Sequence, residues 1–359
     1  MKECNFYAGP SILDNGIVSK AIKQISNREN LSVLEISHRS DKIVSLFEET
    51  KSLVRDLMNL DKTKEVLFLH GGASLQFAMI PLNIKGNGDA GFIDTGIWSK
   101  KAIIEAKKVR NVSIVGSSRD DLYNYIPKIE DYDLSALDYL HLTSNNTIYG
   151  TQFFEFPKCE TPLVVDMSSD VLSRKLNFND FDLIFAGFQK NLGTTGGSLV
   201  VLDKSILKEG NEDELLSMLD YKVHIKAKSM FNTPSVFSVL MCNLTLKWIM
   251  EQGGIGVIEE RNQVKADMLY NEIERNGLFY SYVNKRDRSL MNVCFDTDND
   301  KIEADFLAFC NEQNIIGIKG HRSRGGFRAS LYNSMPIESV EYLIDRMKLF
   351  EKRYVRKGI

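Results

Sequence analysis

The apolar residues of this chain follow two alternating patterns. Short continuous apolar runs predict buried strands, and they occur at residues 65–70, 90–94, 138–142, 163–166, 183–188 and 196–202. Apolar residues at every third or fourth position predict helices at residues 40–60, 75–80, 95–108, 235–251 and 255–276. Buried strands that alternate with helices are typical of an α/β protein with a mostly parallel sheet. The run at 196–202 is the candidate for an antiparallel strand.

The last hundred residues carry a second set of predicted elements. They are a strand at 291–295, a helix at 302–313, strands at 315–318 and 327–332, and a helix at 336–350. A chain of 359 residues exceeds what one hydrophobic core usually serves. We therefore expect a large domain at 16–256 and a smaller α+β domain at 257–359. Residues 1–15 are expected to form an extended arm that packs near the active site.

Composition narrows the class of protein. The formal net charge is -3 and 26% of the residues are charged, which argues against nucleic-acid binding as the main activity. The first ten residues lack an apolar stretch behind a basic start, and no apolar run approaches membrane-spanning length. We expect a cytoplasmic protein with no membrane contact. Five scattered cysteines without CxxC spacing favour reduced thiols over a disulfide framework or a metal site.

Two charged residues follow neighbouring predicted strands. Asp166 ends the strand at 163–166, and Lys190 comes just after the strand at 183–188, before a glycine-rich turn. Loops at strand ends build the sites of open α/β sheets. An amine and a carboxylate placed there suit pyridoxal phosphate, whose aldehyde needs an amine and whose ring nitrogen needs an anion. Taken singly, such a lysine is commonly a solvated loop residue and such an aspartate a helix cap.

Two glycine-rich segments are candidates for phosphate binding. Residues 71–74 (GGAS) follow a predicted strand and open a predicted helix, a context in which free backbone N–H groups bind anions. Glycines in such turns also occur for geometric reasons alone. Gly86, Gly88 and Gly91 match the GxGxxG pattern of dinucleotide-binding proteins. That segment precedes a strand instead of following one, which favours a loop.

Positive side chains gather in two further segments. His38 and Arg39 lie directly before a predicted helix start, where backbone N–H groups favour anions. Residues 319–328 contain three arginines, a lysine and a histidine among glycines, a composition that suits a carboxylate or phosphate receptor. A solvated charge run is the alternative, but Arg328 enters an apolar strand. Trp98, at a strand-to-helix turn, could stack on a flat ring or pack in the core.

Together these segments closely resemble the phosphoserine aminotransferases, class V members of the fold-type I pyridoxal-phosphate enzymes. The resemblance covers essentially the whole chain. Its most specific segments are EISHR at 35–39, HGGASLQF at 70–77, NNTIYG at 145–150, DMSS at 166–169, QKN at 189–191, MFNTP at 230–234, KGHR at 319–322 and RASLYN at 328–333. The resemblance implies a seven-stranded, mostly parallel sheet flanked by helices, pyridoxal 5'-phosphate as cofactor, and a homodimer with shared active sites.

The resemblance also implies a role for each cofactor residue. Lys190 would bind the cofactor covalently and then move a proton, and Asp166 would pair with the ring N–H. Trp98 would stack on the ring, while Thr147 would hydrogen-bond its 3-oxygen. The residues implied around the cofactor phosphate are Ala73, Ser74 and Gln189, with Asn232 and Thr233 of the partner subunit.

Two substrate anion sites follow from the same resemblance. Arg328 would bind the α-carboxylate. The phosphate of phosphoserine or the side-chain carboxylate of glutamate would meet an anion cluster made of His38, Arg39, His321 and Arg322. One cluster serving both substrates implies a ping-pong reaction of O-phospho-L-serine and 2-oxoglutarate to 3-phosphooxypyruvate and L-glutamate, in L-serine biosynthesis. Relatives also act on 4-phosphooxy-L-threonine in pyridoxine biosynthesis.

Some positions depart from part of the family. Ser74 stands where some members carry arginine, Phe188 where a small residue is common, and Thr194-Thr195 where Pro-Ala is more usual. We expect Ser74 to affect substrate affinity and Phe188 to alter the setting of the lysine slightly. The near alternative is a serine-pyruvate or alanine-glyoxylate aminotransferase, which would not need the anion cluster. A nucleotide-binding dehydrogenase would rest on residues 86–91, whose context does not fit.

Overall fold

A seven-stranded sheet forms the centre of the computed structural model, which describes residues 3–26, 31–129, 132–208 and 215–356. The strand order is β2-β10-β9-β8-β5-β3-β4, and β10 alone runs antiparallel to its neighbours. This confirms the predicted sheet, including the antiparallel strand. The strands are β2 (Lys64–Leu69), β3 (Asp89–Asp94), β4 (Val112–Ser117), β5 (Leu137–Thr143), β8 (Leu163–Asp166), β9 (Leu183–Gly187) and β10 (Ser198–Asp203).

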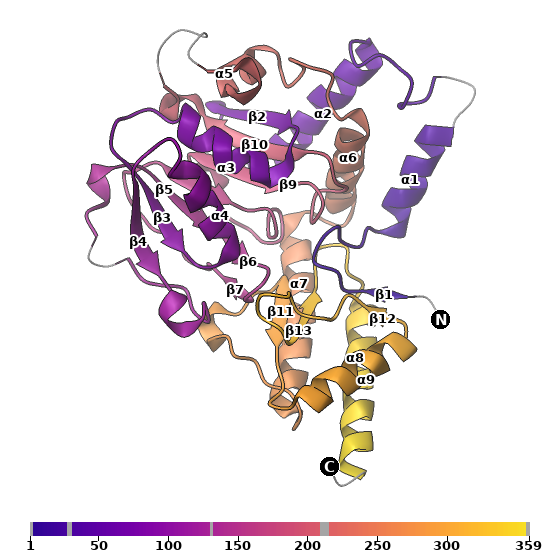
Figure 1. Ribbon diagram of the computed structural model, residues 1–359. Coiled ribbons are helices and arrows are strands. Elements are labelled where there is room, and N and C mark those ends of the chain that lie inside the picture. The colour runs from indigo at the N-terminus through magenta and orange to yellow at the C-terminus, as the bar shows by residue number, and fades with distance from the viewer. Residues whose placement is uncertain (1–2, 27–30, 130–131, 209–214, 357–359) are drawn as a thin grey trace.

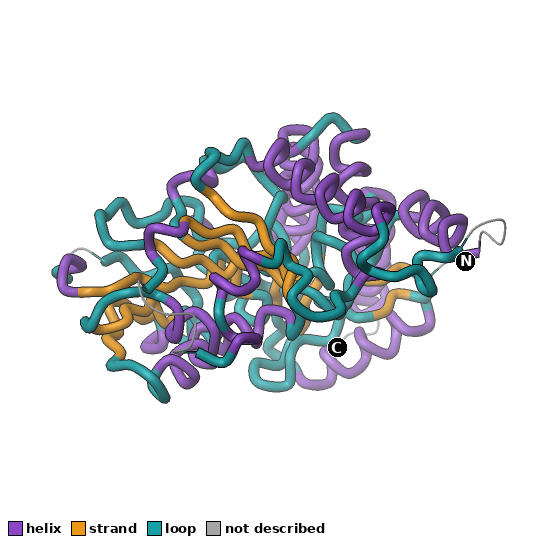
Figure 2. Tube along the Cα trace, turned by 90° about the horizontal axis from the view of Figure 1, so that it is seen from above, coloured by secondary structure: helices purple, strands orange, loops and turns teal. Residues whose placement is uncertain are grey.

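Helices cover both faces of this sheet (Figures 1 and 2). Along β2, Val66 and Phe68 pack into one apolar core, whereas Leu67 and Leu69 pack into another, because successive side chains of a strand point to opposite faces. Burial on both faces explains why the strands read as continuous apolar runs. One core contains residues of α1 (Asn15–Ser26), α2 (Asp41–Met58) and α6 (Val236–Glu251), the other of α3 (Gly72–Asn83), α4 (Ile97–Ala106) and α5 (Tyr221–Lys226).

The C-terminal part builds a separate apolar core below the large sheet in Figure 1. Its elements are α7 (Ile255–Arg275), β11 (Asn292–Phe295), α8 (Asp300–Glu312), β12 (Ile315–Ile316), β13 (Phe327–Ser330) and α9 (Ile337–Arg356). Strand β11 pairs with β13, and β1 (Cys4–Asn5) pairs with β12. Phe6, next to β1, is fully buried in this C-terminal core. The arm therefore packs on the far end of the chain.

Helix α7 connects the two parts of the chain. Ile255 and Ile258, in its first turns, pack into one core of the large sheet, whereas Ala266 and Leu269 pack into the C-terminal core. The helix predicted at residues 255–276 begins at the proposed boundary between the two domains.

Among the elements that were not predicted are strand β4 and helix α1. In strand β4, at one edge of the sheet, only Val115 is buried, and its apolar run is correspondingly broken. In α1, only Ile17 and Ala21 are buried, too narrow a stripe to give a clear helical period. By contrast α2 begins as predicted, with the Ser40 side chain accepting a hydrogen bond from the Ile43 N–H. In the described ranges, no helix is both long and apolar enough to span a membrane.

Candidate active site

Asp166 and Lys190 line one cavity at the carboxyl edge of the large sheet. Asp166 is the last residue of β8, and the adjacent parallel strand β9 ends three residues before Lys190. The cavity has a volume of about 580 Å³, within the range of small-molecule sites. The predicted site residues that line it are Ala73, Ser74, Trp98, Thr147, Asp166, Gln189, Lys190, His321 and Arg328.

The Asp166 carboxylate is buried and only partly hydrogen-bonded. Its Oδ1 accepts hydrogen bonds from the backbone N–H and the hydroxyl of Ser168, at 2.9 and 2.6 Å. Its Oδ2 accepts none of the hydrogen bonds found among the described residues. Burial raises the pKa of Asp166, while the Ser168 hydroxyl and the positive charge of Lys190 lower it. A cationic N–H placed at Oδ2 would stabilise the charged carboxylate.

The Lys190 amine has a pKa well below that of an ordinary lysine. Burial lowers its pKa to about 8, Asp166 opposes that shift, and the charge of Arg328 adds to it. A lysine with such a pKa can act as a nucleophile or a base near neutral pH. Its Nζ lies 5.6 Å from the centroid of the Trp98 ring. The amine therefore faces both a carboxylate and a flat aromatic surface.

The first turn of α3 offers free N–H groups to the cavity. The cap residue Gly71 has φ of 78° and provides no side-chain hydrogen bond, so the first backbone N–H groups lack a side-chain cap. Gly72, Ala73 and Ser74 line the cavity at this turn. A Cβ atom on Gly71 would lie 2.5 Å from Cβ of Leu75, so the turn requires glycine. This arrangement suits a phosphate group.

Trp98 and Arg328 are both oriented by Thr147. The Trp98 Nε1 donates to the Thr147 hydroxyl at 2.9 Å, and Nη1 of Arg328 donates to the Thr147 carbonyl at 2.9 Å. The hydroxyl proton of Thr147 thus remains available for another acceptor. The buried Nε of Arg328 has no partner among the described residues. A bound anion could supply that partner.

The charged residues of the basic loop at 319–328 have two different roles. Arg324 lies 3.2 Å from the Asp296 carboxylate, and its guanidinium is 3.7 Å from the Tyr282 ring centroid, so Arg324 fixes the loop. His321 lines the cavity. Its Nδ1 accepts the Ser323 N–H at 3.2 Å, which places the proton of the neutral ring on Nε2. Burial and nearby positive charges lower the pKa of His321.

Five predicted site residues do not line this cavity, namely His38, Arg39, Asn232, Thr233 and Arg322. His38 and Arg39 lie in the turn before α2, and Arg39 is exposed. The Thr233 carbonyl is 3.0 Å from Nε2 of His70, at the end of β2. Arg322 is exposed beside His321. A single copy of the chain therefore does not gather the whole predicted set.

The residues that depart from the family pattern lie in different surroundings. Phe188 is fully buried with its ring 6.1 Å from that of Phe68, and it does not line the cavity. A Cβ atom on Gly197 would lie 2.7 Å from the Phe188 ring, so a neighbouring glycine makes room for this large side chain. Ser74 and Thr195 do line the cavity.

The GxGxxG match lies away from the cavity. Gly86 and Gly88 fall between α3 and β3, and Gly91 lies within β3. The Gly88 N–H donates to the Asp138 carboxylate at 3.0 Å. This segment is a loop leading into a strand, as its sequence context predicted.

The arm at residues 1–15 was expected to pack near the active site. Ala8, Gly9 and Pro10 line the cavity. The Ala8 carbonyl accepts a 2.7 Å hydrogen bond from the Tyr332 hydroxyl, and the Ser11 hydroxyl donates to the Lys190 carbonyl at 2.6 Å. The only local signal was the compact Gly-Pro pair. Contacts with residues some 180 and 320 positions away give no pattern that a single sequence reveals.

The cavity residues fit pyridoxal phosphate group by group. Lys190 provides the amine, and the open Oδ2 of Asp166 could accept the ring N–H. Trp98 offers a flat surface, and the Thr147 hydroxyl has a proton for the 3-oxygen. The uncapped turn of α3 suits the phosphate. The donor set thus matches the cofactor that the sequence implied.

Comparison with known proteins gives the same family. Residues 4–343 match the family described as Aminotransferase class-V. A phosphoserine aminotransferase of Flavobacterium johnsoniae is 51% identical, over 98% of this chain and 100% of that protein. The structure of phosphoserine aminotransferase from Bacillus circulans subsp. alkalophilus superposes with a TM-score of 0.95 at 37% identity, covering 98% and 99% of the two chains. A pyridoxal-phosphate-bound phosphoserine aminotransferase from Trichomonas vaginalis gives a TM-score of 0.91 at 34% identity, covering 97% of this chain and 100% of that one. The chain therefore belongs to the class-V aminotransferases, among the phosphoserine aminotransferases.

Proposed function

We propose that this protein transfers an amino group from O-phospho-L-serine to 2-oxoglutarate, giving 3-phosphooxypyruvate and L-glutamate, in L-serine biosynthesis. The observation that carries the proposal is the cavity in which Lys190, with a pKa of about 8, and the buried Asp166 lie together. Arg328 and His321 line the same cavity and supply positive or hydrogen-donating groups for a doubly anionic amino acid. Activity on 4-phosphooxy-L-threonine in pyridoxine biosynthesis is compatible with the same groups.

Pyridoxal 5'-phosphate supplies the electron sink that makes the substrate Cα proton removable. Lys190 would bind the cofactor and, once released by substrate, take the proton from the substrate Cα and deliver it to C4′ of the cofactor, since its amine has a lowered pKa and lines the cavity. Asp166 would keep the ring nitrogen protonated. Trp98 and Thr147 would hold the ring, and Ala73, Ser74 and Gln189 the phosphate.

For the substrate, Arg328 would bind the α-carboxylate through its fork of N–H donors. His321 would donate through Nε2 to the distal phosphate or carboxylate, with Arg322 beside it. A serine-pyruvate or alanine-glyoxylate aminotransferase handles side chains without such an anion, so the basic loop argues for phosphoserine. The relatives that match over the full chain carry the phosphoserine name.

We further propose a homodimer in which each copy completes the site of the other. His38, Arg39, Asn232 and Thr233 lie outside the cavity of their own chain, so a second copy could bring them to it. Large apolar side chains near these residues are exposed, including Leu34 at 60% and Phe231 at 45%. Exposed apolar surface of this kind commonly marks a protein interface.

The separate C-terminal core supports a domain boundary near residue 256, with 16–256 as the large domain and 257–359 as the small domain. We propose that residues 1–15 form an arm that closes the cavity on the Lys190 side. A cytoplasmic location is proposed from the thiols, because all five cysteines are free and Cys242, Cys294 and Cys310 are buried.

Absorption spectroscopy tests this function directly. We expect the purified protein, loaded with pyridoxal phosphate, to show a visible band that O-phospho-L-serine bleaches in the absence of any keto acid. Addition of 2-oxoglutarate should then restore the band. A band that responds to alanine but ignores phosphoserine would move the function to the near alternative. Failure to form any band after cofactor addition would contradict the cofactor assignment itself.

The basic loop is tested by Arg322→Ala. Its guanidinium is expected to share the substrate phosphate with His321, so its loss should raise the KM for phosphoserine by more than about fivefold, beyond the effect of one exposed ion pair. Steady-state kinetics would measure this. Arg261→Ala is the control, since Arg261 is an exposed arginine of α7 whose side chain, among the described residues, hydrogen-bonds Gln252 alone. An unchanged KM in Arg322→Ala would remove this residue from the site.

A further inference from the structure

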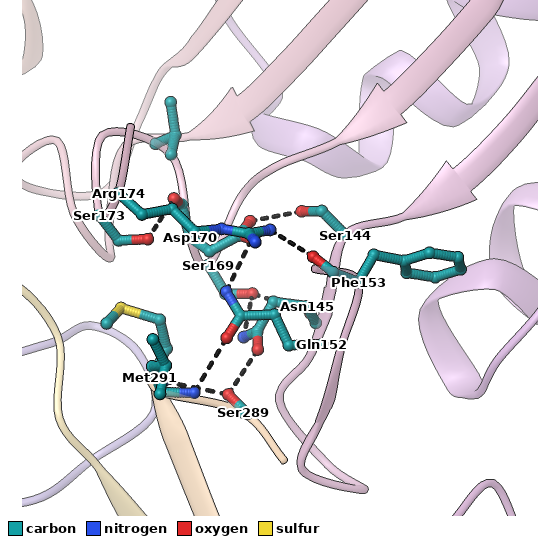
Figure 3. Close-up of polar contacts among 12 residues, drawn as sticks. Ser144, Asn145, Gln152, Phe153, Ser169, Asp170, Ser173, Arg174, Ser289 and Met291 are labelled. Atoms are coloured by element: carbon teal, nitrogen blue, oxygen red, sulfur yellow. Dashed lines mark hydrogen bonds and ion pairs between the residues drawn. The ribbon is translucent and has the colours of Figure 1, made fainter. Parts of the chain in front are cut away.

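A second buried carboxylate lies beside the cavity without lining it. Asp170 is 2% exposed and follows Asp166 by four residues. Its Oδ1 accepts from the Ser144 hydroxyl, while its Oδ2 accepts from Nε2 of Gln152 at 3.1 Å and lies 3.5 Å from Nη2 of Arg174 (Figure 3). Burying such a charge is costly unless it is paired and hydrogen-bonded. These four residues, the Asp170 network, form an anchored polar unit.

One side of the Asp170 network holds the end of strand β8. The Ser144 N–H donates to the Asp166 carbonyl at 3.0 Å, and the Ser144 hydroxyl is within hydrogen-bonding distance of both that carbonyl and Asp170. A hydroxyl has one proton, and a carboxylate is the stronger acceptor. Asp170 thus fixes Ser144, and Ser144 fixes the backbone of Asp166.

The other side of the network reaches the C-terminal core through Gln152. Its Nε2 donates to Asp170, and its Oε1 accepts the Leu290 N–H at 2.9 Å. The reversed amide would place an oxygen against the carboxylate and an NH₂ group against an N–H. Asp170 therefore determines which way the Gln152 amide points, and only that orientation can hold Leu290.

Leu290 lies just before the strand pair that carries Arg328. It precedes β11 by two residues, and in the pairing of β11 with β13 Cys294 stands opposite Arg328. A parallel contact runs through Asn145, which bonds Asn292 of β11 at 2.8 Å and accepts from the Ser289 hydroxyl (Figure 3). The backbone of Asp166 and the strand of Arg328 are thus joined by buried hydrogen bonds.

We propose that Gln152, oriented by Asp170, is a positioning residue that sets Arg328, and with it the α-carboxylate of the substrate, relative to Asp166 and the cofactor. This rests on the proposed function. Both amino-acid substrates carry an α-carboxylate, so the effect of Gln152 should be common to both. Displacement of a binding group by about 1 Å can cost on the order of a hundredfold in rate. The cofactor anchors themselves do not touch Gln152.

The variant Gln152→Met tests this, because methionine keeps the length of the side chain and removes both hydrogen bonds. We expect KM to rise about tenfold for phosphoserine and for glutamate alike, the loss expected for about one buried hydrogen bond. The dissociation constant of pyridoxal phosphate should change less than about twofold, because no hydrogen bond to a cofactor anchor is lost. It can be measured by absorbance titration of the cofactor-free protein. Thr161→Val is the matched control, because within the described ranges the buried Thr161 hydroxyl donates to the Leu134 carbonyl alone, at 2.6 Å.

A second variant approaches the same contact from the other end. Asp170→Asn should release Leu290 as well, since the asparagine amide can turn the Gln152 amide around. The double variant should raise KM no further than Gln152→Met does, because the two residues act through one contact. If Asp170→Asn fails to fold, Gln152→Met still decides the matter.

The outcomes separate this inference from the proposed function. Wild-type KM values in a folded Gln152→Met protein, or an equal rise in Thr161→Val, would overturn the positioning role. A KM change for only one substrate would also overturn it. If wild-type protein binds the cofactor but transfers no amino group from phosphoserine, the proposed function is wrong, and this result does not depend on the Gln152 variants.

Discussion

Replacement of Lys190 by alanine should abolish turnover while leaving the cavity able to take up pyridoxal phosphate without a covalent bond. Lys190 is the only lysine among the described residues that line the cavity, and its pKa of about 8 leaves roughly a tenth of the amine neutral at pH 7, far more than in an ordinary lysine. Proton transfer by a placed side chain contributes about 10² to 10⁴-fold, and the covalent hold on the cofactor is lost as well. We therefore expect a fall of at least about 10⁴-fold in kcat.

Chemical rescue shows whether the missing amine is the cause. Ethylamine added to Lys190→Ala should restore part of the rate, and the rescue should grow as the pH rises, because only the neutral amine accepts a proton. Lys190→Arg is the matched variant, since arginine keeps a positive charge but stays protonated, and it should be inactive. Single-turnover absorbance changes with phosphoserine give the rates. Wild-type turnover in Lys190→Ala would rule out Lys190 as the catalytic residue.

The central sheet was predictable because burial on both faces leaves a direct trace in the sequence. Strands such as β8 and β9 are apolar throughout, and polar residues begin where they end. The parallel arrangement then places Asp166 and the segment of Lys190 at one edge. Strand β4 was missed because Val115 is its only buried residue, whereas β2, at the opposite edge of the sheet, is buried almost throughout and was predicted. Apolar sequence patterns reflect burial, so they do not predict elements that bury few side chains.

The site was only partly predictable, for a related reason. Residues that follow a strand or open a helix, such as Asp166 and Ala73, are placed by local geometry. The arm residues Ala8 to Pro10 reach the cavity because Phe6 is buried in the C-terminal core and Tyr332 holds Ala8. Such placement depends on contacts between distant segments, which no local pattern encodes. The orientation of Gln152 belongs to the same class.

Conversion of Asp166 to asparagine should separate the charge of this residue from its shape. The amide oxygen can still accept both hydrogen bonds from Ser168, so the strand end should keep its geometry. The amide NH₂ then takes the place of Oδ2, where it meets the ring N–H of the cofactor without a negative charge. Loss of one partner of a buried charge pair costs about 2 to 5 kcal/mol, so kcat should fall roughly 30- to 5,000-fold.

Ser168→Ala tests whether the loss in Asp166→Asn comes from the missing negative charge or from a disturbed hydrogen bond at Asp166. It removes the hydroxyl that donates to Oδ1 at 2.6 Å and leaves the carboxylate in place. Loss of one hydrogen bond to a charged group costs about 1.5 to 3 kcal/mol, so kcat should fall by roughly 10- to 150-fold at most. Rates of the phosphoserine half-reaction for both variants, with cofactor saturation checked by absorbance, provide the comparison. Equal losses in Asp166→Asn and Ser168→Ala would mean that geometry at this strand end, and not the negative charge of Asp166, is what the reaction requires.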